Sequence, residues 1–272
     1  MNKRVRGFLL SLTALALSLL VVFPLLYGIL GAFKEPSEFA AVPPALLPRR
    51  ITNVRSFADV CASLPVLRYF VNSLVTALLG AAVRMTLAVL AAYAFAFFDF
   101  RGKKALFFLL LGTMMLPADT LVITNYQTVS RLRLLDTYLG MAVTTFVGAS
   151  QMFMLRQRFL SSPKPMREAA ALDGCGDMRF MVSVLLPVCS PVLLTLFCQS
   201  FVNNWNAYLW PLLVTNRVET RTVQVGLSML AASDNYPLML AGTALSLIPA
   251  VILFCLLRHA LDRSSGEGAL IG

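Results

Sequence analysis

Long apolar runs separated by short polar segments make up most of this sequence. The hydrocarbon core of a bilayer is about 30 Å thick, so a helix rising about 1.5 Å per residue needs roughly 20 apolar residues to cross it. The fifth run extends beyond what one span needs, over residues 180–216. The pattern predicts an all-α membrane protein with six transmembrane helices in a single domain, 1–272. The expected spans are residues 7–33, 69–98, 105–124, 137–155, 183–210 and 235–257.

The polar segments between these runs differ in character. Residues 34–68 contain five prolines, which favour a structured loop over a flexible one. Residues 125–136 place Val129, Leu132 and Leu135 at every third position, so a short amphipathic helix is expected there. The remaining long segment, 156–182, separates the fourth run from the fifth.

The composition agrees with a membrane protein. Hydrophobic residues make up 58% of the chain and charged residues only 13%. Soluble domains are about 25% charged, so a soluble enzyme is disfavoured. One His and five Cys, most of them inside apolar runs, make a metal centre or a His-dependent catalytic triad a poor interpretation.

The basic residues indicate how the chain is oriented. The formal net charge is +10, from 23 Lys and Arg against 13 Asp and Glu. Six spans place both termini on one side, and thirteen of the 23 basic residues fall on that side, in segments 1–6, 99–104, 156–179 and 258–272. Because Lys and Arg are enriched on the cytoplasmic side, both termini are predicted to be cytoplasmic. The charge therefore reflects topology and does not indicate nucleic-acid binding.

The segment that follows the fourth run predicts a helix, a turn and a second helix. Ser162 is expected to cap the first helix, and Pro163 suits its first helical position. Gly174 can adopt the left-handed conformation that ends a helix. Asp177 is expected to cap the second helix. Glu168 offers an acceptor for an Arg of a partner. An ordinary solvated amphipathic loop would fit the same pattern equally well.

The same segment carries a resemblance to a known family. Glu168-Ala169-Ala170, followed by Gly174 and later by Leu186-Pro187, is similar to the EAA motif of ABC importer permeases, with Val184 where the family usually has Ile. The motif also lies between the fourth and fifth of six spans, as in that family. Further matches to its sugar-importer (maltose-type) branch are Asn72-Ser73-Leu74, Ala91-Ala92-Tyr93-Ala94, Leu116-Pro117, Trp205-Asn206 and, with two differences, the ending Gly266–Gly272.

The resemblance implies an ATP-driven, binding-protein-dependent importer in the bacterial cytoplasmic (inner) membrane. Within the branch, the chain looks most like glycerol-3-phosphate permeases, so glycerol 3-phosphate or a related glycerol phosphate is the expected solute. A mono-, di- or oligosaccharide is the alternative. The implied partners are a second homologous permease subunit, an ATPase subunit dimer, an extracytoplasmic solute-binding protein and membrane lipid. The residues expected to couple the chain to the ATPase are Glu168, Ala169, Ala170, Asp173 and Gly174.

The chain itself is expected to be a transport subunit and no enzyme. Gly102-Lys103 lacks the glycine that a phosphate-binding loop requires five residues earlier, where Phe97 stands. ATP and Mg²⁺ should therefore be bound by the partner ATPase, and the chain should carry no cofactor or metal of its own.

Polar residues inside the apolar runs are candidates for a solute path. Arg84 lies near the middle of the second run, where a lone charge costs about 2.5–3.5 kcal/mol. It should pair with a carboxylate or carbonyl of a neighbouring helix, or attract an anionic solute. The polar and aromatic residues of the fifth run suit hydroxyl-rich solutes, although contacts between helices would use the same groups: Asn203, Asn204, Trp205, Asn206 and Tyr208. Asp119, near the outer end of the third run, is a weaker candidate.

Two rival classes fit the sequence less well. A secondary transporter needs sites for a coupling ion, and intramembrane carboxylates are scarce here. An intramembrane enzyme needs paired catalytic groups at membrane depth, and the apolar runs show none.

Overall fold

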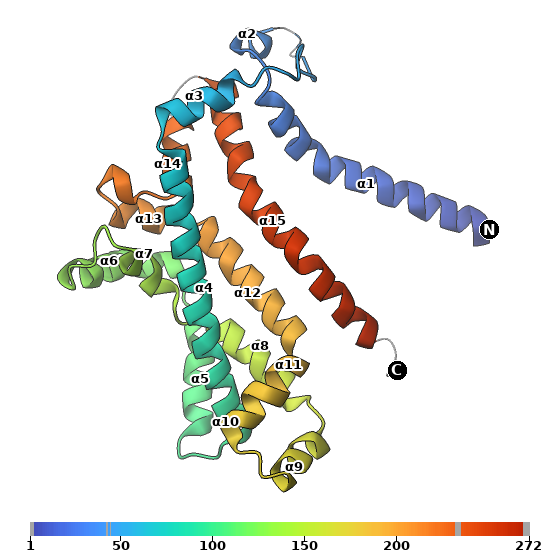
Figure 1. Ribbon diagram of the computed structural model, residues 1–272, viewed down its shortest axis with the longest axis vertical. Helices are drawn as coiled ribbons and strands as arrows, with labels where there is room; N and C mark the ends of the chain where they lie inside the picture. Colours follow the sequence, from blue (N-terminus) through green and yellow to red (C-terminus); the bar gives the residue numbers. More distant parts are fainter. Residues whose placement is uncertain (1–2, 42, 44, 232–234, 269–272) are drawn as a thin grey trace. The chain divides into compact units, whose positions relative to one another are not determined.

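The computed structural model describes residues 3–41, 43, 45–231 and 235–268, and every regular element within them is helical (Figure 1). The chain divides into two compact units. One unit comprises Met1–Leu67 with Val225–Pro249, and the other comprises Arg68–Gln224 with Ala250–Gly272.

The first unit is built on α1 (Lys3–Gly31) and the first half of α15 (Tyr236–Gly268). These helices approach closely because Gly31 has no side chain, and a Cβ there would lie 2.5 Å from Leu240 Cδ1. Ala32, Val60, Leu230 and Ala241 form the buried centre. The short helices α2 (Pro36–Phe39), α3 (Arg55–Ser63) and α14 (Val223–Ala231) complete the unit.

Two buried charged residues hold part of the proline-rich loop in place. The Lys34 ammonium donates to the carbonyl of Ala45 and lies 4.3 Å from the ring centroid of Tyr27. The Glu38 carboxylate accepts from the backbone N–H of Arg49, 3.0 Å away. Lys34 is 1% exposed and Glu38 4%, so both contacts are shielded from water. The stretch from residue 45 to residue 49 is thereby fixed to the helix end.

The second unit is organised around α4 (Val66–Phe97), a helix of 32 residues. Ala88 and Ala92 of α4 are small and buried, which lets neighbouring helices pack against it. Leu155, Phe159 and Leu185 fill the same core. The other helices are α5 (Lys103–Thr113), α6 (Val122–Arg131), α7 (Tyr138–Ala142), α8 (Ala149–Leu160), α9 (Lys164–Leu172), α10 (Asp177–Phe180), α11 (Leu186–Val188), α12 (Ser190–Trp205) and α13 (Leu209–Val214). Short turns η1 (Ala118–Leu121), η2 (Val143–Thr145), η3 (Met181–Leu185) and η4 (Val218–Thr220) connect them.

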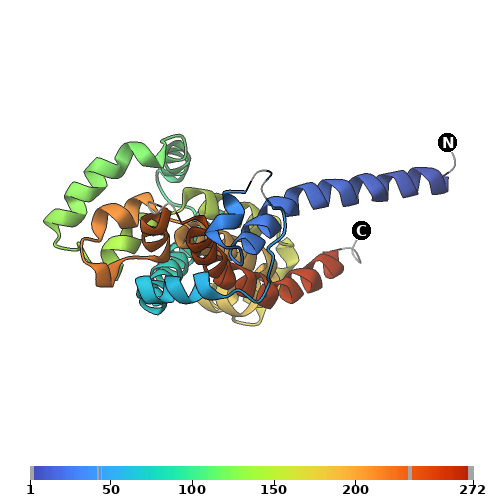
Figure 2. The ribbon, with the colours of Figure 1, turned by 90° about the horizontal axis from the view of Figure 1, so that it is seen from above.

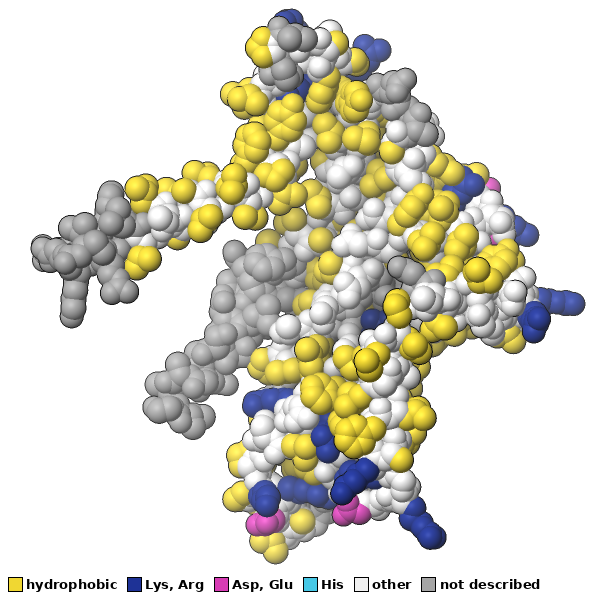
Figure 3. All heavy atoms as spheres, turned by 180° about the vertical axis from the view of Figure 1, so that it is seen from behind, with side chains coloured by type: hydrophobic (Ala, Val, Ile, Leu, Met, Phe, Trp, Pro, Cys, Tyr) yellow, Lys and Arg dark blue, Asp and Glu magenta, His cyan; other side chains and the backbone are white. Residues whose placement is uncertain are grey.

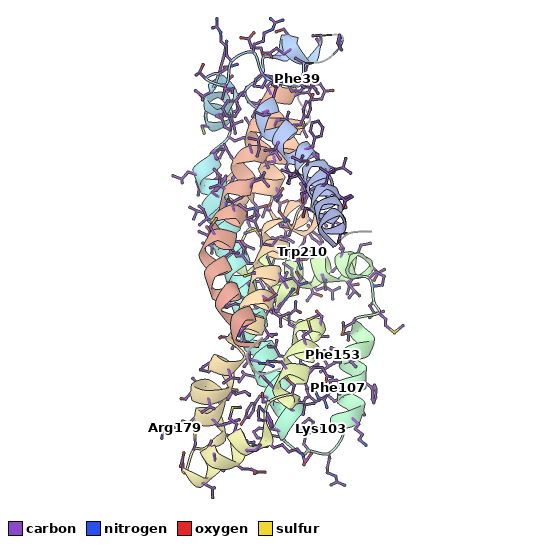
Figure 4. All side chains as sticks on the ribbon, turned by 90° about the vertical axis from the view of Figure 1, so that its right-hand side faces the viewer. Phe39, Lys103, Phe107, Phe153, Arg179 and Trp210 are labelled. Atoms are coloured by element: carbon purple, nitrogen blue, oxygen red, sulfur yellow. The ribbon has the colours of Figure 1, made fainter. Side chains whose placement is uncertain are left out.

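Aromatic contacts join α5 to α8. The rings of Phe107 and Phe153 point toward each other, with centroids 6.3 Å apart (Figure 4). The guanidinium of Arg156 lies 4.4 Å from the centroid of Phe107 and donates to the carbonyl of Phe95. This contact fastens α8 to the last turns of α4.

Several of the predicted spans correspond to apolar helices in the structure. Within the described residues, three helices are long and apolar enough to cross a membrane, over Leu10–Gly31, Val66–Phe97 and Tyr236–Leu253. Two bent helix pairs pass the same test together: Tyr138–Thr145 with Ala149–Leu160, bent by 53°, and Asp177–Val188 with Ser190–Trp205, bent by 82°.

The third expected span does not form one continuous helix. Helix α5 ends at Thr113, and the chain turns through Met114–Leu116 before Pro117. Proline disfavours helical backbone at the residue before it, which explains the break. The count of six spans therefore stays a prediction.

The amphipathic helix expected at 125–136 is present but shifted. Helix α6 ends at Arg131, with Val129 buried and Leu132 exposed. It ends early because Arg133, directly after the C-cap residue, has a positive φ angle of 56°, which does not continue a right-handed helix. Figures 1 and 2 both show α6 and α7 beside α13.

Candidate functional site

The helical segment α9–α10 lies at the end of the second unit where α4 also ends (Figure 1). Helix α9 begins at Lys164, so Pro163 occupies the N-cap position and not the first helical position expected for it. The expected cap by Ser162 is wrong: its hydroxyl donates to the carbonyl of Arg158, in the preceding helix. The same carbonyl also accepts from the Ser161 hydroxyl at 2.8 Å, so the last turn of α8 holds both serines.

The end of α9 is closed by Gly174, as the sequence predicted. Gly174 has φ +71°, in the left-handed region. Its N–H donates to the carbonyl of Ala171 at 3.1 Å, and the N–H of Cys175 donates to the carbonyl of Ala170 at 2.9 Å. These two bonds are the Schellman arrangement, which satisfies carbonyls that the helix leaves without partners. The chain consequently leaves α9 in a fixed direction.

The second helix is capped differently from the expectation. Gly176, not Asp177, is its N-cap residue. The Asp177 carboxylate instead accepts from the Tyr93 hydroxyl of α4 at 3.1 Å and from the Arg167 guanidinium of α9 at 3.4 Å. Arg167 also lies 4.8 Å from the ring centroid of Phe97. The Asp177 carboxylate therefore binds Tyr93 and Arg167 and does not cap its own helix. These contacts hold both short helices, α9 and α10, against α4.

The α9 segment has an inner and an outer side. Met166, Ala170 and Cys175 pack against the core of the unit. Glu168, Ala169, Asp173 and Gly174 are exposed, and Leu172 is 89% exposed. Among the expected coupling residues, Ala170 therefore faces inward and the other four face outward. A rigid helix that presents carboxylates, small residues and an uncovered leucine is suited to docking in a groove of another protein.

Basic side chains surround this segment. Figure 3 shows Lys and Arg gathered over the end of the unit that carries α9 and α10. Arg179 points outward from α10 (Figure 4). The exposed basic residues in this region include Arg101, Lys104, Arg158, Lys164 and Arg179. A pocket of about 580 Å³ opens behind α9, with Phe97, Phe159 and Phe180 among its lining residues.

Arg84 is paired with a carbonyl. Its Nε donates to the backbone oxygen of Thr145, at the bend between η2 and α8. A Cβ at Gly148 would lie 3.0 Å from Arg84 Cδ, so glycine makes room for the arginine there. The ion pairs of the described residues join Arg55 to Asp59, Lys103 to Asp99 and Arg167 to Asp177, and Arg84 is in none of them.

The other predicted solute-path residues do not form one polar surface. Trp205 is 2% exposed and packs between Phe70 and Phe201. Asn203 and Tyr208 are exposed, and Asn206 accepts from Gln224 at 3.3 Å. The backbone of Asp119 lies in η1, and its side chain lies outside the described part of the structure.

The structure reveals polar contacts that the sequence did not predict. Asn72 is 2% exposed and uses its whole amide: it donates to the carbonyls of Glu219 and Arg221 and accepts from the Tyr138 hydroxyl. Asn204 lies against Gly80 of α4 and has a buried amide nitrogen. The spacing of Ser200 and Asn204, four residues apart, was the available signal that these two share one helix face.

Comparisons with known proteins agree with this geometry. Residues 1–265 match the binding-protein-dependent transport system inner membrane component family. The sn-glycerol-3-phosphate transport system permease protein UgpE of Yersinia pestis bv. Antiqua (strain Antiqua) is 30% identical over 250 residues, 89% of each chain. Its counterpart in Escherichia coli O1:K1 / APEC is 30% identical over 263 residues, 93% of this chain and 94% of the other.

A solved structure shares the fold. It is the crystal structure of a bacterial ABC transporter involved in the import of the acidic polysaccharide alginate. The TM-score is 0.81 at 19% sequence identity, over 95% of this chain and 98% of that one. These matches confirm the resemblance to importer permeases, the helical membrane fold, the inner-membrane location and the role as a transport component. The chain belongs to the family of binding-protein-dependent transport system inner membrane components.

Proposed function

We propose that this chain is a transmembrane permease subunit of an ATP-driven importer for sn-glycerol 3-phosphate or a related glycerol phosphate. The observation that carries the solute is the 30% identity to two glycerol-3-phosphate permeases over 89–93% of this chain. An arginine inside α4, without a carboxylate partner among the described residues, is consistent with an anionic solute.

The proposed assembly contains four kinds of component. This chain pairs with a second homologous permease subunit through its membrane region. Two ATPase subunits bind ATP and Mg²⁺, and an extracytoplasmic solute-binding protein delivers the solute from the other side. The chain forms one permease domain with six spans and both termini in the cytoplasm. The basic surface around α9 and α10 supports this orientation, because Lys and Arg are enriched on the cytoplasmic side.

Helix α9 is the proposed contact with the ATPase. Glu168 and Asp173 present carboxylates to basic groups of the partner, and Ala169 permits close approach. Ala170 seats the helix on the core, and Gly174 fixes its end. Closure of the ATPase dimer would then move α9 and α10 as one body, because Asp177 binds both Arg167 and Tyr93.

The solute path is proposed to pass Arg84. Asn203, Asn206 and Tyr208 are exposed near the end of α12, where a solute entering the path would meet amide and hydroxyl groups. Trp205 supports that helix end through its contacts with Phe70 and Phe201. Asp119 remains a candidate contact at the outer surface.

Uptake by the reconstituted importer tests this function. Proteoliposomes containing both permeases and the ATPase dimer, supplied with the binding protein, should accumulate labelled glycerol 3-phosphate only when ATP is inside. Uptake of a mono-, di- or oligosaccharide in place of the phosphate ester would refute the proposed solute. Uptake that needs an ion gradient and no ATP would refute the importer class.

A further inference from the structure

Helices α4 and α12 run antiparallel and bring one turn of each together. Along α4, Ala92 and Ala88 share a core with Leu196, and further back Gly80 lies against Asn204. Figure 1 shows the same antiparallel course. Moving one turn along α4 from Gly80 reaches Arg84, and moving one turn back along α12 from Asn204 reaches Ser200. Arg84 and Ser200 therefore lie at the same level of the bundle.

Two polar groups on this face of α12 are buried without a hydrogen-bond partner in the described part of the chain. They are Ser200 Oγ and Asn204 Nδ2. Ser200 is 0% exposed. Burying a hydroxyl or an amide without a partner costs about 1–3 kcal/mol, so such groups call for a ligand.

The neighbouring glycine allows polar side chains to approach α4 closely. A Cβ at Gly80 would lie 2.5 Å from Asn204 Nδ2 and 2.6 Å from Thr145 Oγ1. Any side chain at this position would collide with both polar atoms. Glycine at residue 80 therefore lets α4, α12 and the bend after η2 converge on one point.

The groups without a hydrogen-bond partner here include several donors. Arg84 donates through Nε to Thr145 O. Its two terminal nitrogens have no hydrogen bond or ion pair within the described residues. The Thr145 hydroxyl donates to Ala142 O, and Gln151 Oε1 accepts from Ser150, so these groups are already engaged. What remains is a guanidinium fork, an amide NH₂ and a hydroxyl. A guanidinium fork close to an amide NH₂ and a hydroxyl can donate several hydrogen bonds to one oxyanion.

We propose that Arg84, Ser200 and Asn204 form a binding site for a phosphate-type oxyanion inside the membrane region. The guanidinium and the Asn204 amide donate to the phosphoryl oxygens, and the Ser200 hydroxyl supplies a further bond. The site takes the phosphoryl end of the solute and leaves the glycerol part outside it. Naming the solute rests on the proposed function, whereas the binding of a phosphoryl group does not.

Binding of radiolabelled inorganic phosphate tests the site without requiring transport. The complete complex in lipid nanodiscs should bind phosphate and glycerol 3-phosphate, and glycerol should not compete. Ser200→Ala should weaken binding about tenfold, because one hydrogen bond to a charged group is lost. Asn204→Asp should abolish it, because an isosteric carboxylate repels the anion and pairs with Arg84. Gly80→Ala should also block it by filling the point of convergence.

Thr195→Ala is the matched control. Thr195 is an exposed residue of the same helix whose hydroxyl donates to its own helix at Pro191 O. Phosphate binding unchanged in this control and reduced in Ser200→Ala supports the site, provided that copurification of the subunits is normal in both. Equal phosphate binding in Ser200→Ala, Asn204→Asp and wild type would overturn it, even if the complex imports glycerol 3-phosphate.

One further outcome distinguishes the proposed phosphate site from the proposed solute. A complex that imports a neutral sugar but binds phosphate in a Ser200-dependent manner would retain the site and refute the solute. Competition by glucuronate as strong as that by phosphate would overturn the assignment of a phosphoryl group, since a carboxylate would then suffice.

Discussion

Gly174 shows how one residue determines the course of a whole segment. Its φ of +71° is accessible to glycine and strained for most other residues. Space is not the constraint, since a Cβ there would meet nothing within 4 Å. Gly176, two residues later, is equally open but has φ −69°, which any residue adopts.

Replacing each of these glycines by serine distinguishes an effect of backbone conformation from an effect of side-chain contact. Gly174→Ser should strain the end of α9 by about 1–2 kcal/mol and reduce uptake, while Gly176→Ser should leave uptake unchanged. Serine also suits the N-cap position of residue 176. ATP-dependent uptake, normalised to the amount of chain in the membrane, is the measurement. Equal losses in both variants would contradict a conformational role.

Asp136 makes a pH-dependent attachment. Partial burial raises the pKa of Asp136, but hydrogen bonds from Arg217 N–H, the Thr220 hydroxyl and Asn216 N–H outweigh burial and hold the pKa below its usual value. A lowered pKa in the folded state stabilises the fold above the unfolded pKa, and this stability is lost as the pH falls through the folded value.

The amides of residues 216 and 217 should report this change. Their hydrogen-exchange protection factors should be constant near neutral pH. They should fall only as the pH drops through the lowered pKa of Asp136, below the usual range of an aspartate, where the carboxylate becomes protonated. Asp136→Asn should lower protection at neutral pH and remove the acid-dependent fall. Equal protection factors in Asp136→Asn and wild type at neutral pH would contradict this assignment.

At the scale of elements, the sequence predicted apolar helices well and their interruptions poorly. The runs at 7–33, 69–98 and 235–257 correspond to long helices, because apolar length alone decides them. The 53° bend after η2 and the π-helical turn η3 depend on how neighbouring helices pack, which hydropathy does not encode. The caps expected at Ser162 and Asp177 were wrong for a related reason: Arg158 O and Tyr93 competed for them.

The contact between α7 and α13 offers a test of packing. Trp210, labelled in Figure 4, donates through Nε1 to Gly140 O at 3.1 Å. A Cβ at Gly140 would collide with the backbone oxygen of Leu134. Gly140→Ala should therefore lower the thermal unfolding midpoint by several degrees, since backbone must move.

Gly112 provides the matched control for this substitution. It lies in α5, and a Cβ there would meet nothing within 4 Å. Gly112→Ala should therefore leave the midpoint unchanged or raise it, because alanine gains roughly 1 kcal/mol of helix propensity over glycine. A stable Gly140→Ala variant would show that α7 can shift away from Leu134.

At the scale of the whole molecule, two cysteines can report the topology. Cys61 is exposed in the proline-rich region, and Cys175 is partly exposed beside Gly174. In single-cysteine variants, an impermeant maleimide added to intact spheroplasts should label Cys61 at once and Cys175 only after permeabilisation. Labelling of both from outside would contradict the six-span topology with cytoplasmic termini.

The extent of burial explains why the chain needs other molecules. Only 6% of the apolar window in α1, Leu10–Gly31, is buried within the structure, against 39% for α4. So much exposed leucine requires lipid or another subunit as its cover. The sequence predicted this class of protein from composition. It could not place Asn204 against Gly80, because these residues lie more than 100 positions apart in the chain.

Helix α4 has a thermodynamic consequence for transport. It carries Tyr93, which binds Asp177, and Arg84, nine residues or about 14 Å back along the same helix. A shift of α4 therefore moves both Arg84 and Tyr93. Thermodynamic linkage makes this coupling reciprocal. If an anion bound at Arg84 changes the affinity of α9 for its partner by some factor, the bound partner changes the affinity of Arg84 for the anion by the same factor. Measuring either affinity with and without the other ligand gives the coupling free energy of the importer.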